Sequence, residues 1–299
     1  MESRKICRLL IAIFIVLILM FCFLFKIEES KQTVLSEEFI FEAVENISSN
    51  GISISEEMIL RDVPETNIYC LDEKAEEDFF EIISSSLITT VFGGNVSTTQ
   101  FDTPSGTTLG IYTNEGDESE LGRLVFSEND YTFSISRKGV SMSGGEDPIT
   151  NMDTSSVSET AMGKISEIVE KLNSKSRMDY RITGSTFDND FLIVTVNQTV
   201  AGYDIDTAHI NFVFENDDII IVSGKWITSL AKSEYHNTLT DGVNVLYKLD
   251  FDNVSAIHGE RIVYSLRKAD NNRTFLLPCW EISYNDNNGN FKKSYFDAV

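Results

Sequence analysis

Residues 179–228 read DYRITGSTFDNDFLIVTVNQTVAGYDIDTAHINFVFENDDIIIVSGKWIT, and this run decides the fold. Apolar and alternating residues in it predict four strands, at Asp179–Phe187, Phe191–Ala201, His209–Glu215 and Ile219–Thr228. The acidic clusters Asp188-Asn189-Asp190 and Glu215-Asn216-Asp217-Asp218 lie between strands. Asp and Asn tolerate the left-handed backbone of tight hairpin turns, so we interpret both clusters as turns and not as calcium loops. The stretch therefore predicts an antiparallel meander.

An amphipathic helix is expected before this meander, over Ser156–Asn173. Its apolar residues recur every three or four positions on one face: Ala161, Ile165, Ile168, Val169 and Leu172. The first half of the chain has the same order, with a helix that begins after Ser36 and ends at Asn50-Gly51, and period-two strands between Asn95 and Val140. The recurring unit predicts an α+β fold, with helices on one face of antiparallel sheets.

The N-terminus contains an uncharged apolar run, Leu9–Phe25, which would span about 25 Å as a helix. Three basic residues precede it, and Glu28 and Glu29 follow it closely. The positive-inside rule then predicts a cytoplasmic tail at 1–8, a transmembrane helix at 9–25 and an extracytoplasmic remainder, in a single-pass cell-membrane protein. The alternative is a cleaved signal peptide, but the run exceeds the usual apolar core of about 7–15 residues and no small-x-small site follows.

One bulky stripe of this expected helix is the candidate interface with a partner's membrane helix. It comprises Leu10, Phe14, Leu17, Ile18, Phe21 and Phe25. No glycine lies in the run, so close packing of the GxxxG type is not expected. A plain lipid-facing anchor is the alternative.

The polar stretch 142–155, MSGGEDPITNMDTS, is the predicted linker. It separates a first extracytoplasmic α+β subdomain at 26–141 from a second at 156–299. The expected fold class is thus a single N-terminal transmembrane helix followed by two helix-plus-antiparallel-meander subdomains.

Charge and motifs narrow the functional classes. The 47 acidic and 24 basic residues give a net charge of −23, which disfavours nucleic acid as a partner. The three histidines have no second ligand at metal spacing, and no P-loop, GxGxxG, GxSxG or HExxH motif is present. We therefore expect no enzyme, catalytic residue, cofactor or metal, although a hydrolase with dispersed carboxylates stays open.

Two pairs of residues allow a structural and a functional interpretation. Cys70 and Cys279 are either a disulfide or two separate thiols, and their strand-like apolar neighbours favour separate thiols. Trp226 and Trp280 are expected to be buried anchors of two sheets, with exposed platforms for sugar or peptide as the alternative.

Three segments resemble the YycI-type regulatory proteins: LSEEFIFEAVENISSNGISISEEMILRDVPETNIYCLD at 35–72, VNQTVAGYDIDTAHINFVFENDDIIIVSGKWI at 196–227 and LLPCWEISYNDNNGNFKKSYFDAV at 276–299. The last is similar to the PepSY-like closing hairpin of that family. The resemblance implies a membrane-anchored extracytoplasmic regulator of a WalK-type sensor histidine kinase, in a two-component system that controls cell-wall homeostasis. A YycH-like sister protein is the implied second partner. Cys70 and Cys279 depart from the family pattern, and a PepSY-like module that binds a peptide, a protease or a cell-wall fragment is the alternative.

Overall fold

The computed structural model describes residues 34–63, 66–71, 75–103, 106–113, 119–127, 131–140, 154–174, 176, 178–237, 239–268 and 273–298, together with 14, 18 and 20. The chain forms two compact units. One unit comprises residues 1–66, 237–261 and 280–299, and the other comprises residues 67–236 and 262–279. We call them the terminal unit and the central unit.

The central unit is built on an antiparallel sheet whose strands lie in the order β2-β3-β4-β5-β9-β8-β7-β6. The strands of the first half of the chain are β2 (Val96–Thr103), β3 (Gly106–Thr113), β4 (Glu120–Ser127) and β5 (Thr132–Arg137). Those of the second half are β6 (Asp179–Asp188), β7 (Phe191–Val200), β8 (Tyr203–Glu215) and β9 (Asp218–Lys225). The two halves join where β5 pairs with β9, with Ser134 opposite Ser223.

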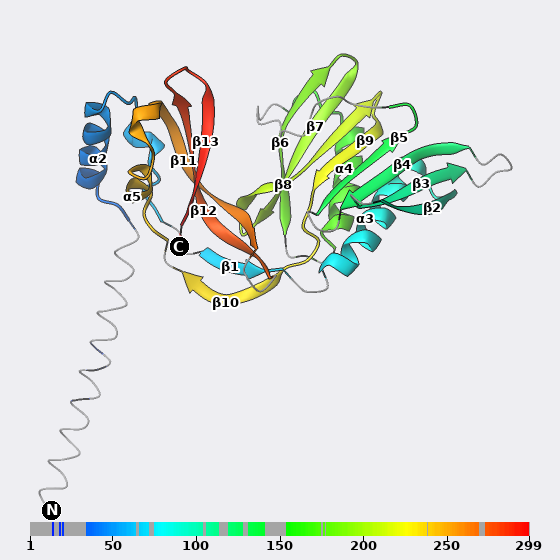
Figure 1. Ribbon diagram of the computed structural model, residues 1–299, viewed down its shortest axis with the longest axis horizontal. Helices are drawn as coiled ribbons and strands as arrows, with labels where there is room; N and C mark the ends of the chain where they lie inside the picture. Colours follow the sequence, from blue (N-terminus) through cyan, green and yellow to red (C-terminus); the bar gives the residue numbers. More distant parts are fainter. Residues whose placement is uncertain are drawn as a thin grey trace, which may run out of the picture. The chain divides into compact units, whose positions relative to one another are not determined.

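Two helices, α3 (Ala75–Phe92) and α4 (Glu159–Leu172), cover one face of this sheet (Figure 1). The predicted apolar stripe of α4 is confirmed, because all five of its residues are buried in the core between helices and sheet. Ser158 caps this helix by accepting the main-chain N–H of Ala161 at 3.0 Å. Alternate residues of the strands, such as Phe133 and Ile135 of β5, complete the core.

The opposite face of the sheet, which we call the outer face, carries the residues between the core positions. One row of cross-strand partners on it crosses seven strands: Phe101, Thr108, Val125, Ser134, Ser223, Asn211 and Thr195. The β8 and β9 end of this face also has a small apolar cluster of Ile193, Val213, Ile220 and Ile221. The outer face is therefore mixed, with apolar side chains among Ser, Thr and Asn.

The predicted hairpin turns are confirmed. Asn189 connects β6 to β7 with φ 57°, and Asn216 and Asp217 connect β8 to β9 with φ 49° and 67°. These left-handed backbone angles are the ones that Asn and Asp tolerate best.

The terminal unit contains α2 (Glu37–Ser49), η1 (Glu56–Met58), α5 (Gly242–Leu246), η3 (Phe251–Asn253) and β13 (Phe291–Asp297). Ser36 caps α2 through the N–H of Phe39 at 3.2 Å, as predicted. Strands β11 (Val254–Lys268) and β12 (Thr274–Asp286) contribute residues to both units. The remaining strands are β1 (Thr66–Cys70), which pairs antiparallel with β12, and β10 (Ala231–Asn237).

The expected α+β fold class of two helix-plus-antiparallel-meander subdomains is wrong. The structure is rich in strand, and the β5–β9 pairing places both meanders in one sheet. Alternation in the sequence shows which face of each strand is apolar, but it does not show which strand edges will pair. The predicted linker at 142–155 stays a prediction, since all of it except Thr154 and Ser155 lies outside the described residues.

The expected N-terminal transmembrane helix is also not borne out. In the part of the chain that the structure describes, no helix is long and apolar enough to cross a membrane. Of the segment Leu9–Phe25, only Phe14, Ile18 and Met20 belong to that part.

Candidate functional site

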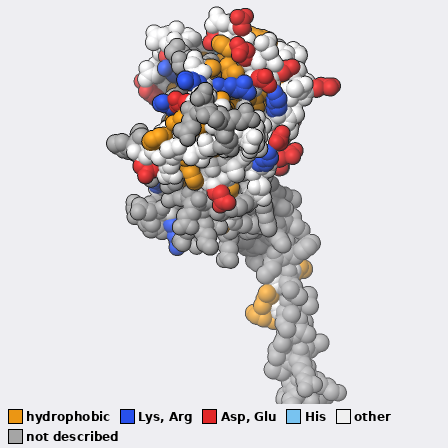
Figure 2. All heavy atoms as spheres, turned by 90° about the vertical axis from the view of Figure 1, so that its right-hand side faces the viewer, with side chains coloured by type: hydrophobic (Ala, Val, Ile, Leu, Met, Phe, Trp, Pro, Cys, Tyr) orange, Lys and Arg blue, Asp and Glu red, His pale blue; other side chains and the backbone are white. Residues whose placement is uncertain are grey.

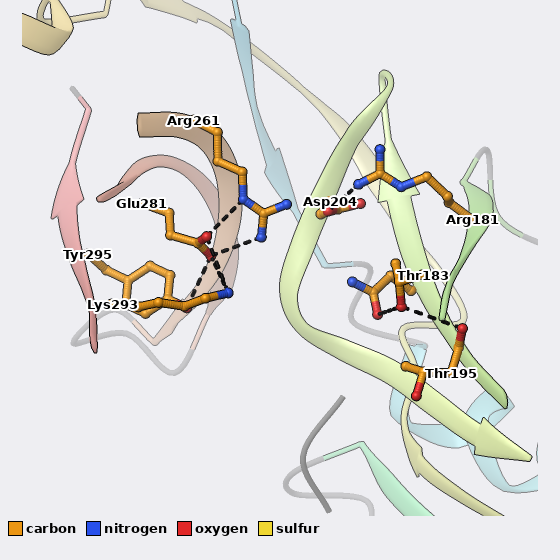
Figure 3. A network of polar contacts seen from close by, with 9 residues as sticks. Arg181, Thr183, Thr195, Asp204, Arg261, Glu281, Lys293 and Tyr295 are labelled. Atoms are coloured by element: carbon orange, nitrogen blue, oxygen red, sulfur yellow. Dashed lines mark hydrogen bonds and ion pairs between the residues drawn. The ribbon is translucent and has the colours of Figure 1, made fainter. Parts of the chain in front are cut away.

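Two glutamates of the terminal unit have opposite environments, and each is a candidate functional group. Glu281 lies on β12, where only 4% of its side chain is exposed. Arg261 of β11 donates to it through two nitrogens, at 2.8 and 3.0 Å. Two residues of β13 also contact Glu281. Nζ of Lys293 lies 3.3 Å from Oε1 of Glu281, and the Tyr295 hydroxyl donates to Oε2 at 3.2 Å. Figure 3 shows the three side chains pointing towards the carboxylate.

The partners of Glu281 keep it ionised. Burial alone would raise the pKa of this carboxyl, but the hydrogen bonds and charges of Arg261 and Lys293 outweigh burial and lower the pKa below its ordinary value. A bidentate guanidinium pair fixes the carboxylate in one orientation. The cluster therefore stabilises three adjacent strands and has little capacity to exchange a proton near neutral pH.

Glu260, the neighbour of Arg261 on β11, has the contrary environment. Its Oε1 accepts the main-chain N–H of Leu60 at 2.7 Å, whereas its Oε2 is buried without a hydrogen-bond partner among the described residues. Burial raises the pKa of Glu260 to about 7, the Leu60 N–H opposes this rise, and the charge of Asp241 adds to it. This carboxyl can therefore take up or release a proton close to neutral pH.

The start of α5 confines the Glu260 carboxyl. A Cβ added at Gly242 would overlap the Glu260 carboxyl, so any larger residue there would force this carboxyl to move. Asp241 caps α5 by accepting the N–H of Asn244 at 2.9 Å, which keeps the charge of Asp241 beside Glu260. The Glu260 carboxyl is therefore closely packed, and one of its oxygens has no hydrogen bond among the described residues. The free energy of such a group depends strongly on whether it is protonated.

The central unit has a separate polar group on its outer face. Thr195 donates to the Asn211 side chain at 2.6 Å across β7 and β8, and the guanidinium of Arg181 pairs with the buried Asp204 (Figure 3). The hydroxyl of Thr183 lies 3.5 Å from the main-chain oxygen of Thr195. These bonds join β6, β7 and β8, so we assign them to the stability of the sheet.

The predicted membrane-helix interface is largely outside the described residues. This applies to Leu10, Leu17, Phe21 and Phe25. Phe14 and Ile18 are described and exposed, at 66% and 49%.

The tryptophans and cysteines have the expected structural roles. Trp226 and Trp280 are completely buried, and their indole N–H groups donate to the Asn173 side chain at 3.0 Å and to the Thr240 carbonyl at 2.8 Å. Cys70 and Cys279 are not joined in a disulfide. Both predictions, of buried anchors and of separate thiols, are confirmed.

Sequence reasoning missed both glutamates. Glu281 had one available signal, because it stands in the apolar strand LLPCWEI, where a charge requires a partner. No sequence signal pointed to Glu260, because Leu60 and Gly242 are close to it only in the folded chain. Across the described residues, no group of three or more His, Cys, Asp or Glu side chains is placed to hold a metal ion.

Comparisons with known proteins give several remote structural similarities, two of which are described here. No family model and no curated protein matches the chain. An uncharacterized protein from Eubacterium rectale ATCC 33656 is similar over 83% of this chain and 87% of its own, with a TM-score of 0.47 and 10% identity. The C-terminal domain of Bacillus megaterium YpeB is similar over 75% of this chain and 92% of its own, with a TM-score of 0.35 and 14% identity.

Proposed function

We propose that this protein is an extracytoplasmic regulator that binds a sensor histidine kinase, with a YycH-like sister protein as its second partner. The sequence resemblance to the YycI-type proteins suggests this role. Regulation of this kind requires only that the protein bind one state of the kinase more tightly than the other, and a differential of about 1.4 kcal/mol shifts the equilibrium tenfold. The protein needs a binding surface for this and no catalytic group.

The observation that carries the proposal is an exposed apolar pair on the outer face of the central unit. Phe101 of β2 and Val125 of β4 both face Thr108 of β3 in the cross-strand register, and they are 50% and 44% exposed. A large aromatic side chain held on a rigid sheet loses little entropy when it binds, and a partner that covers these side chains would remove apolar surface from water. We propose that this pair contacts the kinase.

In vivo cross-linking of the tagged full-length protein tests the proposal, followed by mass spectrometry of the material that co-purifies. We expect a histidine kinase and a second regulatory protein, and we expect the double variant Phe101→Ser/Val125→Ser to lose the kinase. Phe187→Ser is the matched control, since Phe187 is an exposed aromatic residue on β6, at 61% against 50% for Phe101.

Equal recovery of the kinase with the double variant would show that the surface is wrong. Recovery of a peptide, a protease or a cell-wall fragment without a kinase would instead support the PepSY-like binding module.

A further inference from the structure

A hollow of about 350 Å³ lies where β4 begins and β5 ends, in the central unit. Its described lining includes Glu120, Arg123, Ser136, Arg137 and Lys138. Three of these side chains are cationic and one is anionic, so the lining carries a net charge of +2 in a chain of net charge −23. Figure 2, which views the molecule from the side of β2, β3 and β4, shows Lys and Arg side chains close together beside hydrophobic ones. The positive charge of the hollow is therefore a local feature and does not follow from the composition of the chain.

Main-chain hydrogen bonds hold the backbone of Lys138 in place. The N–H of Lys138 donates to the carbonyl of Leu121 at 2.8 Å, and the turn after it closes with Val140 N–H on the Arg137 carbonyl at 3.2 Å. Gly139 makes this turn possible with φ +81°. The backbone of Lys138 is therefore fixed at the rim of the hollow, while its side chain can turn towards a ligand.

Arg137 supplies a permanent charge in the wall. Its guanidinium donates to the carbonyl of Val91, in the last turn of α3, at 3.1 Å. Its Nε is buried and has no hydrogen-bond partner among the described residues. The bond to Val91 is to a neutral carbonyl, so it leaves the charge of the guanidinium in place. This charge contributes to the potential of the hollow, and it also helps to lower the pKa of Asp218.

Glu120 acts as an internal counter-anion. Its carboxylate accepts from Nε of Arg123, and this bond, with the charges of Arg123 and Lys138, lowers the pKa of Glu120. Glu120 therefore stays ionised at neutral pH and pairs with one of the exposed cations, Arg123. An external anion would have to compete with it for Arg123.

We propose that this hollow binds a small oxyanion, a phosphate or carboxylate group, through the side chains of Arg123 and Lys138. The guanidinium of Arg123 offers paired N–H donors, and the ammonium of Lys138 offers a mobile point charge. Neither the resemblance to the regulatory family nor the apolar pair on the outer face requires such a ligand.

Titration of the full-length protein with inorganic phosphate tests the proposal, and sodium acetate serves as the second probe. Unfolding temperature and binding heat are measured against sodium chloride of equal ionic strength. We expect a saturable rise in unfolding temperature with at least one probe. The stronger probe then identifies the phosphate or the carboxylate class.

Three variants make the test specific. Arg123→Gln/Lys138→Gln should weaken binding at least about tenfold, since both charged donors are lost. Glu120→Gln should tighten binding several-fold, because it removes the competing carboxylate and frees Arg123. A structural defect would weaken binding, so a gain in affinity supports the site directly. Lys171→Gln is the control, since Lys171 pairs with Glu167 on the surface of α4 and should leave binding unchanged.

No saturable effect of either probe would overturn the proposal. Equal binding by the wild type, the double variant and Glu120→Gln would also overturn it, because the anion would then act elsewhere on the protein.

Discussion

The carboxylate of Glu260 accepts the main-chain N–H of Leu60 at 2.7 Å, although the two residues are 200 positions apart. The bond attaches the segment after η1 to β11 within the terminal unit. The Glu260 carboxyl has a pKa of about 7, so this acceptor changes between its neutral and its charged form near neutral pH. The stability of the terminal unit should therefore depend on pH through this one carboxyl.

We predict that Glu260 makes the protein less stable as pH rises. Its pKa is about 7 in the folded chain and 4.5 as the ordinary value, so between these pH values the folded state binds more protons than the unfolded state. Stability from this group is complete below about pH 4.5 and is lost as pH rises through about 7, by about 3 kcal/mol in total. Urea unfolding of the wild type and Glu260→Gln at pH 5, 6, 7 and 8 measures the difference. The free energy of unfolding of the variant minus that of the wild type should increase towards pH 8. A difference that does not change with pH would contradict the prediction.

Gly242→Ala should destabilise the protein by about 1–3 kcal/mol, because the new Cβ would overlap the Glu260 carboxyl. The backbone of Gly242 is helical, so the cost arises from this contact and not from φ. Gly163→Ala is the matched control: Gly163 lies in α4 with nothing within 4 Å of an added Cβ, and alanine should stabilise that helix by about 0.5–1 kcal/mol. In a Glu260→Ala background the cost of Gly242→Ala should shrink markedly, and an undiminished cost would place the strain elsewhere.

Glu281→Gln should cost about 2–3 kcal/mol, since it removes the buried charge that Arg261 and Lys293 share. The lowered pKa of Glu281 means that its contribution is present above the ordinary value of 4.5 and is lost as pH falls below it, opposite in sign to Glu260. Glu167→Gln, which breaks an exposed pair with Lys171 on α4, should change stability by no more than about 0.5 kcal/mol. Chemical denaturation of the three proteins at pH 7 compares them. Similar effects of both substitutions would show that the Glu281 cluster is no stronger than a surface ion pair.

Local features of this fold could be predicted from sequence because their causes are local. Three features depend only on residues that are close in sequence: the apolar stripe of α4, the cap at Ser36 and the left-handed turn at Asn216. The burial of Trp226 and Trp280 followed from their positions in apolar stretches of sequence. All of these hold in the structure.

Long-range pairing could not be predicted in the same way. Ser134 and Ser223 are neighbours across β5 and β9, and neither residue nor its flanking alternation specifies the other. Glu260 has the same difficulty, since its raised pKa depends on Leu60 and Asp241, which precede it by 200 and 19 positions. A charged residue in an apolar strand, as at Glu281, does indicate a buried partner, but it does not identify Arg261.

The β5–β9 pairing yields the last prediction. If the first and second halves of the chain were independent subdomains, residues 26–141 and 156–299 would each fold alone. The structure instead places Phe133 and Ile135 of β5 in the same core as Phe212 and Val222 of β8 and β9, so each half leaves its share of that core exposed when it is expressed alone. We expect both separate halves to lack cooperative thermal unfolding, whereas mixing or co-expressing them restores it. Circular dichroism and calorimetry of the halves, alone and together, decide the matter. Cooperative unfolding of either half by itself would show that the shared sheet is not required for folding.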